Sequence, residues 1–103
     1  MLKQNKEITI SGKNALEALK EIEFMLVSLR KMGTYYIGKP QNEYQDATTK
    51  FIDNFGITGR LAKVRRLICE GFDTTLGEDD MDDLERHMQD LEFWKPTDET
   101  LNK

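Results

Sequence analysis

The sequence predicts an all-α fold: a small four-helix domain preceded by an extended N-terminal segment that has β character. Apolar residues recur at intervals of three and four through most of the chain, and glycine or proline interrupts the pattern at only a few points. Charged residues make up 33% and hydrophobic residues 38%, which suits helices with one apolar stripe and broad polar faces. A chain of 103 residues is expected to form one domain over residues 1–103, with flexible ends at 1–6 and 97–103.

The segment EITIS, residues 7–11, alternates between polar and β-branched side chains. A lone strand is not stable without a partner. We therefore expect this segment either to pair with a copy of itself in an oligomer or to lie extended over the helices.

The first helix is expected at residues 14–32, with Asn14 as its N-cap and Glu17 completing a capping box. Gly33 is the expected stop. Phe24 and Val27 lie outside the apolar face, which indicates a second contact, with another subunit or with a loop of the same chain. The expected core face consists of Ala15, Leu19, Ile22, Met25, Leu26, Leu29 and Met32.

Two further helices are expected at residues 42–55 and 58–71, the second of them capped by Thr58. The inward stripe of the first should be Tyr44, Ala47, Phe51 and Phe55, and that of the second Ile57, Leu61, Val64, Ile68 and Phe72. Four basic residues should lie mostly outward on the second: Arg60, Lys63, Arg65 and Arg66.

A fourth helix is expected at residues 78–93, because Met81, Leu84, Met88 and Leu91 follow three- and four-residue spacing. Eight acidic residues fall between Glu78 and Glu92, against one arginine. The acidic residues in the first turn of this expected helix would be stabilised by the positive end of the helix dipole.

The acidic helix is the first functional candidate, as a surface that binds a basic partner protein by charge complementarity. The alternative is that the four basic residues of the third helix neutralise it within the fold. The favoured function is a non-enzymatic protein that inhibits or regulates its partner, works as a homo-oligomer and is of a type frequent in phages and mobile elements. The expected partner-binding residues are Asp79, Asp80, Asp82, Asp83, Arg86, His87 and Asp90.

Two other functions stay open. The loop TYYIGKP places Tyr35, Tyr36 and Lys39 together, and such rings stack on a base while lysine binds phosphate, which would suit a nucleotide-sequestering protein. Residues 51–68 have the outline of a helix-turn-helix DNA-binding regulator with a basic second helix.

Composition argues against several other classes. The single histidine and the single cysteine, Cys69, predict no metal site, no disulfide and no cofactor, and no motif indicates a catalytic residue. A net charge of −4 disfavours general binding to nucleic acid or to an anionic membrane. A lone thiol without a secretory signal predicts the cytoplasm.

Overall fold

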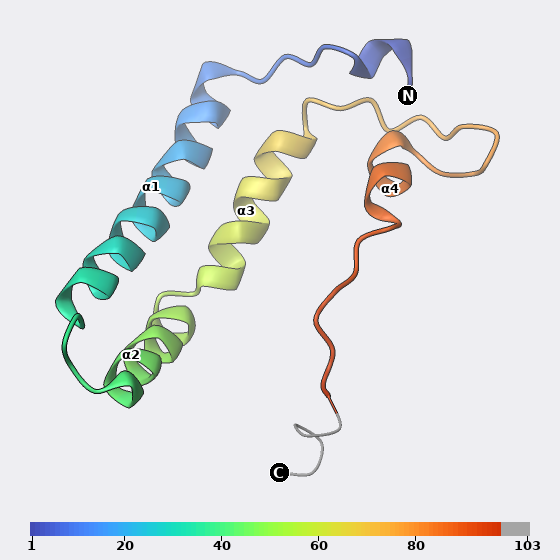
Figure 1. The fold of residues 1–103 in the computed structure, drawn as a ribbon. Helices are drawn as coiled ribbons and strands as arrows, with labels where there is room; N and C mark the ends of the chain where they lie inside the picture. The colour runs from blue at the N-terminus through green and yellow to red at the C-terminus, as the bar shows by residue number, and fades with distance from the viewer. Residues whose placement is uncertain (98–103) are drawn as a thin grey trace. The chain divides into compact units, whose positions relative to one another are not determined.

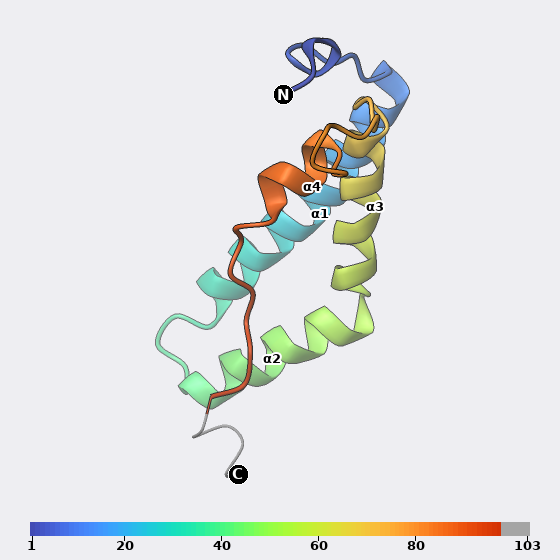
Figure 2. The same cartoon turned by 90° about the vertical axis from the view of Figure 1, so that its right-hand side faces the viewer.

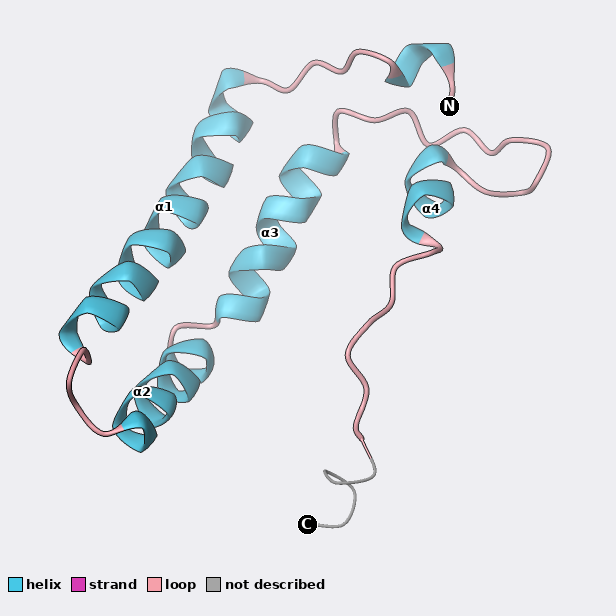
Figure 3. Ribbon diagram, viewed as in Figure 1, coloured by secondary structure: helices cyan, strands magenta, loops and turns pink. Residues whose placement is uncertain are grey.

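The computed structural model describes residues 1–97, and over them it confirms the all-α fold (Figures 1 and 3). Residues 98–103, for which flexibility was predicted, lie outside this range. The chain divides into two compact units, residues 7–72 and residues 1–6 with the chain from 73 onward, and each is described by itself. The elements are the 3-10 helix η1 (Lys3–Asn5) and the α-helices α1 (Gly12–Tyr35), α2 (Gln41–Asn54), α3 (Ile57–Cys69) and α4 (Asp83–Met88).

Helix α1 begins earlier and ends later than predicted. Ser11, not Asn14, is the N-cap, since its hydroxyl accepts a hydrogen bond from the Asn14 amide at 3.1 Å. Gly33 does not end the helix, because a glycine in a helix interior costs only about 1 kcal/mol. The chain leaves the helix at Tyr36 and turns at Gly38, whose φ of +78° favours glycine.

Helices α2 and α3 match their predicted ranges to within two residues, but the N-cap of α3 differs. Gly56 holds this position with a φ of 61°, in the left-handed region, and its carbonyl accepts from the Arg60 amide. Thr58 lies one position inside the helix. A glycine was needed here because α2 and α3 are joined by only two residues.

The extended segment before α1 forms no strand within residues 1–97. It lies against the end of α3, where a Cβ atom on Gly71 would stand 3.2 Å from the Thr9 carbonyl oxygen and from a side-chain carbon of Ile10. Of the two expectations for this segment, the structure therefore agrees with the extended one, and the absent side chain of Gly71 permits the close approach.

The core of residues 7–72 is small. Met25, Phe51 and Ile57 are its buried centre, and Phe24, Met32 and Val64 pack against them. Phe24, predicted to lie off the core face, has its ring centroid 5.8 Å from those of Phe51 and of Phe55. Figure 1 shows α1 and α3 running side by side in opposite directions, with α2 joining their ends.

The predicted core face of α1 is confirmed for Met25 and Met32 but is wrong for four of its members, because the helix is rotated. Leu19, Ile22, Leu26 and Leu29 are 57%, 39%, 42% and 43% exposed, while Ala18, which was not predicted, is buried. The physical reason is that α1 is apolar over more than one face, so its periodicity allows two orientations, and burial of Phe24 against α2 selects one. Leu61 and Ile68 of α3, also predicted inward, are exposed as well.

Adjacent residues of α2 provide a direct test of this core. Phe51 is 8% exposed and Ile52 is 43% exposed. Replacing Phe51 with Ala should lower the free energy of unfolding by about 3–5 kcal/mol, since it removes a buried ring and leaves a cavity. The control Ile52→Ala should cost less than about 1 kcal/mol. Urea denaturation followed by circular dichroism measures both, and equal losses would contradict the packing described.

Candidate functional site

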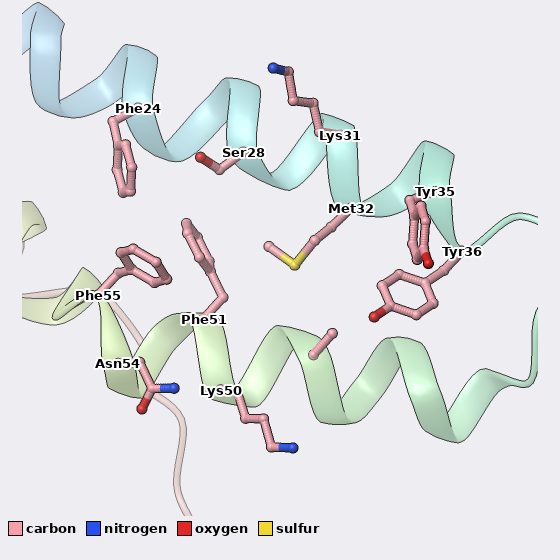
Figure 4. A pocket seen from close by; sticks show the side chains of 11 residues that line it. Phe24, Ser28, Lys31, Met32, Tyr35, Tyr36, Lys50, Phe51, Asn54 and Phe55 are labelled. Atoms are coloured by element: carbon pink, nitrogen blue, oxygen red, sulfur yellow. The ribbon is translucent and has the colours of Figure 1, made fainter.

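A hollow of about 510 Å³ lies between α1 and α2, within residues 7–72 (Figure 4). Its floor is formed by Phe24, Phe51 and Phe55, whose ring centroids are 5.4–5.8 Å apart, and by Met32. This volume falls within the range of small-molecule binding sites. A mostly apolar lining with a few polar groups at the rim is also typical of such sites.

The helical repeat explains why space remains between the two helices. Phe24, Ser28 and Met32 are four residues apart on α1 and therefore lie in one line, and Ala47 and Phe51 form a line on α2 that faces them. Ser28 and Ala47 are small. The large side chains on either side of them hold the helices apart, so the short ones leave the hollow open.

Two of the three predicted ligand-binding residues line this hollow. Tyr35 ends α1 and Tyr36 follows it, and their rings meet edge to face with centroids 4.9 Å apart. Lys39 does not line the hollow; its Nζ stands 4.3 Å from the centroid of the Tyr35 ring, a cation–π contact. Sequence reasoning missed Phe24 and Met32 as members of the site, although their spacing of eight on one helix was a usable signal.

Lysines border the hollow on both helices. The stems of Lys31 and Lys50 line its rim, and Figure 4 shows their ammonium groups directed away from it. Asp46 bonds Lys50 at 2.8 Å and raises its pKa, so this amine stays charged. A second hollow of about 430 Å³ shares Lys31 and Tyr35 with the first and is also lined by Arg30. Among the described residues, Lys31 and Arg30 take part in no ion pair, so the unpaired positive charge beside the two hollows comes from them and not from Lys50.

The acidic segment does not form the long helix predicted for residues 78–93. Helix α4 is Asp83–Met88, six residues long. Asp80 has a φ of 59°, so the chain turns before the helix, and the Asp82 carboxylate caps α4 by accepting from the Glu85 amide at 2.8 Å. Short acidic side chains favour such turns and caps over helix interiors, and this is why the predicted first turn of the helix is a loop.

The apolar stripe predicted for this helix is only partly formed. Met81 precedes α4, Leu91 follows it, and Met88 and Leu91 are 46% and 53% exposed. Leu84 and Met88 lie inside the helix, and of these two only Leu84 is half-buried. Hydrogen bonds rather than an apolar stripe therefore hold this segment.

Asp83 is the centre of this part of the chain. It is 2% exposed, and its carboxylate accepts from the Leu2 amide at 2.8 Å, from the Asn5 side chain at 2.7 Å and from Arg86 at 2.6 Å. Asn5, itself 4% exposed, also exchanges two bonds with the backbone of Asp73. Residues 1–6 were expected to be flexible, yet Asn5 is buried and joins the N-terminus to α4.

Three of the seven residues predicted to bind a partner are thus bonded to one another. Arg86 bridges Asp83 and Asp79, with two bonds of 2.8 Å to the Asp79 carboxylate. Asp82 is occupied as a cap. Asp80, His87 and Asp90 are exposed.

Two of the four basic residues of α3 turn toward α1 rather than outward. Arg60 pairs with Glu21 at 3.4 Å and stacks on the Phe24 ring, and Lys63 pairs with Glu17 at 3.2 Å. Arg65 and Arg66 are exposed. The outward basic surface of α3 is therefore smaller than the four-residue surface expected of a helix-turn-helix DNA-binding protein. Within residues 1–97, no group of three or more His, Cys, Asp or Glu side chains is arranged to hold a metal ion.

Comparison with protein-family models, with curated protein sequences and with solved structures finds no match to this chain. Among the described residues, no helix combines the length and the apolar character that crossing a membrane requires.

The carboxylate network predicts an acid transition that is confined to the unit containing α4. Asn5 lowers the pKa of Asp83 below the ordinary 3.8, and Arg86 lowers that of Asp79. Groups of this kind contribute stability that is fully present above about pH 5 and is lost as the pH falls through their lowered pKa values. We expect the amide resonances of Leu2 and Glu85 to move to unfolded positions as the pH falls below the ordinary 3.8 and through these lowered pKa values, while those around Phe51 stay native.

The control for this titration is Asp83→Asn. It should displace the Leu2 resonance already at neutral pH, because it removes the charged acceptor on which Asn5 and Arg86 converge. Native Leu2 and Glu85 resonances in the unchanged protein at pH 2 would contradict this account.

Proposed function

We propose that this chain is a non-enzymatic cytoplasmic protein that binds a nucleotide in the aromatic hollow between α1 and α2. The observation that carries the proposal is the hollow itself, about 510 Å³ in volume, which is lined by three phenylalanine rings, by Tyr35 and Tyr36 and by two lysines. Among the described residues, no group of three or more His, Cys, Asp or Glu side chains is arranged to hold a metal ion beside it. The aromatic and apolar lining of the hollow supports binding and sequestration of a flat ligand.

The two hollows suit the two ends of a nucleotide. A base is flat and apolar on its faces, and it would stack on the floor near Phe24 and Phe51, where ring–base contacts contribute about 1–3 kcal/mol each. Its phosphate would extend past Tyr35, where Lys31 borders both hollows. The four-carbon stem of lysine lets its ammonium group turn from solvent to such a phosphate.

Removing the Tyr35 ring tests this proposal. Tyr35 is 63% exposed, so Tyr35→Ala should leave the melting temperature nearly unchanged and weaken nucleotide binding roughly tenfold. Lys31→Ala should weaken it too and should flatten its dependence on salt, because one phosphate contact is lost. Calorimetric titration with a panel of mononucleotides, cyclic dinucleotides and dinucleotide cofactors provides the measurement.

The matched control is Ile37→Ala, which changes a 77% exposed residue of the same loop that does not line the hollow. Its affinity should equal that of the unchanged protein. If no member of the panel binds at millimolar concentration, the nucleotide proposal is wrong. If Tyr35→Ala lowers the melting temperature strongly, the ring belongs to the core instead.

A second candidate function is the binding of a basic partner protein, which the chain would inhibit or regulate through its acidic segment. Within residues 1–97, five exposed acids there take part in no ion pair: Glu78, Asp80, Glu85, Asp90 and Glu92. Phe93 and Trp94 beside them are 77% and 82% exposed. Aromatic side chains are enriched in the centre of protein–protein contact surfaces, and polar groups form the rim around them.

Charge reversal distinguishes this second function from the first. Asp80→Lys with Asp90→Lys should abolish capture of a basic partner from the source cells, whereas Glu43→Lys with Asp53→Lys, an equal charge change on α2, should not. The captured complex should also dissociate as salt rises, because exposed charges are screened beyond about 8 Å near physiological ionic strength. Quantitative mass spectrometry of the captured proteins measures both, and equal capture by the two variants would contradict the proposal.

We also propose that the chain acts as a homo-oligomer.

A further inference from the structure

Helix α1 carries a row of large aliphatic side chains on its solvent side. Leu19 is 57% exposed, and Ile22, Leu26 and Leu29 are 39–43% exposed. These four exposed side chains belong to a unit whose buried apolar residues number only five. Scattered exposed leucines are ordinary on protein surfaces, but a continuous apolar patch marks a contact site.

The spacing of the row is that of a coiled-coil seam. Its members alternate steps of three and four residues, and Ala15 and Gly33 continue the alternation at either end. From Ala15 to Gly33 the seam is about 27 Å long at 1.5 Å per residue. Positions that repeat every 3.5 residues meet a partner helix along their whole length. The residues of the unit's own core, such as Met25 and Met32, lie on the adjoining flank.

Helix α3 widens this apolar surface. Lys63 pairs with Glu17 and Glu21 across one side of the α1–α3 pair. Leu61 and Ile68 are on the flank of α3 away from Lys63, as the 100° turn per residue requires, and are 54% and 40% exposed. Because α1 and α3 run in opposite directions (Figure 1), this flank is on the same side of the pair as Leu19 and Ile22.

The charges beside the seam identify what covers it. Glu23 follows Ile22 and Arg30 follows Leu29, so an acid and a base border the same edge of the seam, seven residues apart. Within one helix that separation is too great for a pair, and neither side chain has an ion pair within residues 1–97. In an antiparallel pair of identical helices, Glu23 of each copy faces Arg30 of the other.

We propose that two copies of this chain associate through the α1 seam, antiparallel and about a two-fold axis near Leu26. A parallel pair would set the charged edge of one copy against the Met25 and Met32 flank of the other, which already packs against α2 and α3. Closed two-fold dimers are also the commonest assembly of identical chains. This inference does not depend on the ligand in the hollow, since that hollow opens on a different face of α1.

Light scattering and paired variants test it. Light scattering should be measured at about 100 micromolar, which is well above the dissociation constants usual for specific interfaces. At this concentration the unchanged protein should have twice the 12.0 kDa mass of one chain. Leu26→Lys should reduce it to one chain. Ile52→Lys introduces the same charge at an equally exposed aliphatic position of α2 and should leave the dimer intact.

The charged edge provides a test that does not disturb the seam. Glu23→Arg places arginine opposite arginine in the antiparallel dimer and should weaken association roughly tenfold, as like charges facing each other do. Adding Arg30→Glu to that variant should restore the affinity. Both residues are exposed, so neither variant should change the helix content.

A mass of one chain for the unchanged protein overturns the proposal. So does a dimer that survives Leu26→Lys, or a double charge variant no tighter than Glu23→Arg. None of these three outcomes decides whether a nucleotide binds, which the Tyr35→Ala titration measures separately in protein that keeps Arg30, since Arg30 lines the second hollow.

Discussion

Burial of Phe24 against Phe51 and Phe55 determines how α1 is turned, and the rest of residues 7–72 depends on that choice. A helix with apolar residues over more than one face can present either face to its neighbours. Aromatic rings bury more surface than aliphatic side chains and gain from edge and offset contacts with one another. The cluster therefore draws the Phe24 side of α1 toward α2, and Leu19, Ile22 and Leu26 turn to solvent as a result.

The unit that contains α4 is held together in a different way. Its buried centre is a carboxylate, Asp83, whose acceptor positions are filled by Leu2, Asn5 and Arg86. A buried charge left without partners would be strongly destabilising, so these donors must all be in place at once. Because this unit has few apolar contacts, its directional hydrogen bonds select one arrangement of the short chain.

The sequence predicted the features that depend on interactions between residues close together in the chain. The existence of four helices and the ranges of the first three follow from spacing, glycine and proline, and the structure agrees to within three residues. The rotation of α1 could not be predicted, because the aromatic partners of Phe24 lie on another helix. Likewise, the acidic residues before Asp83 were expected to form the first turn of a helix, where the helix dipole favours negative charge. The chain instead turns at Asp80. Tyr35 and Tyr36 were identified for the site from their chemistry, whereas its floor needed the pairing of α1 with α2.

The size of the hollow depends on two small residues as well as on the large side chains that hold α1 and α2 apart. Ser28 and Ala47 are the short positions in two facing rows, and neither is a member of the packed centre formed by Met25, Phe51 and Ile57. Evolution could therefore narrow or widen the cavity at these positions while the scaffold stayed the same. Such a fold can diversify in the molecules it accepts through few substitutions, because Ser28 and Ala47 shape the hollow without belonging to its packed centre.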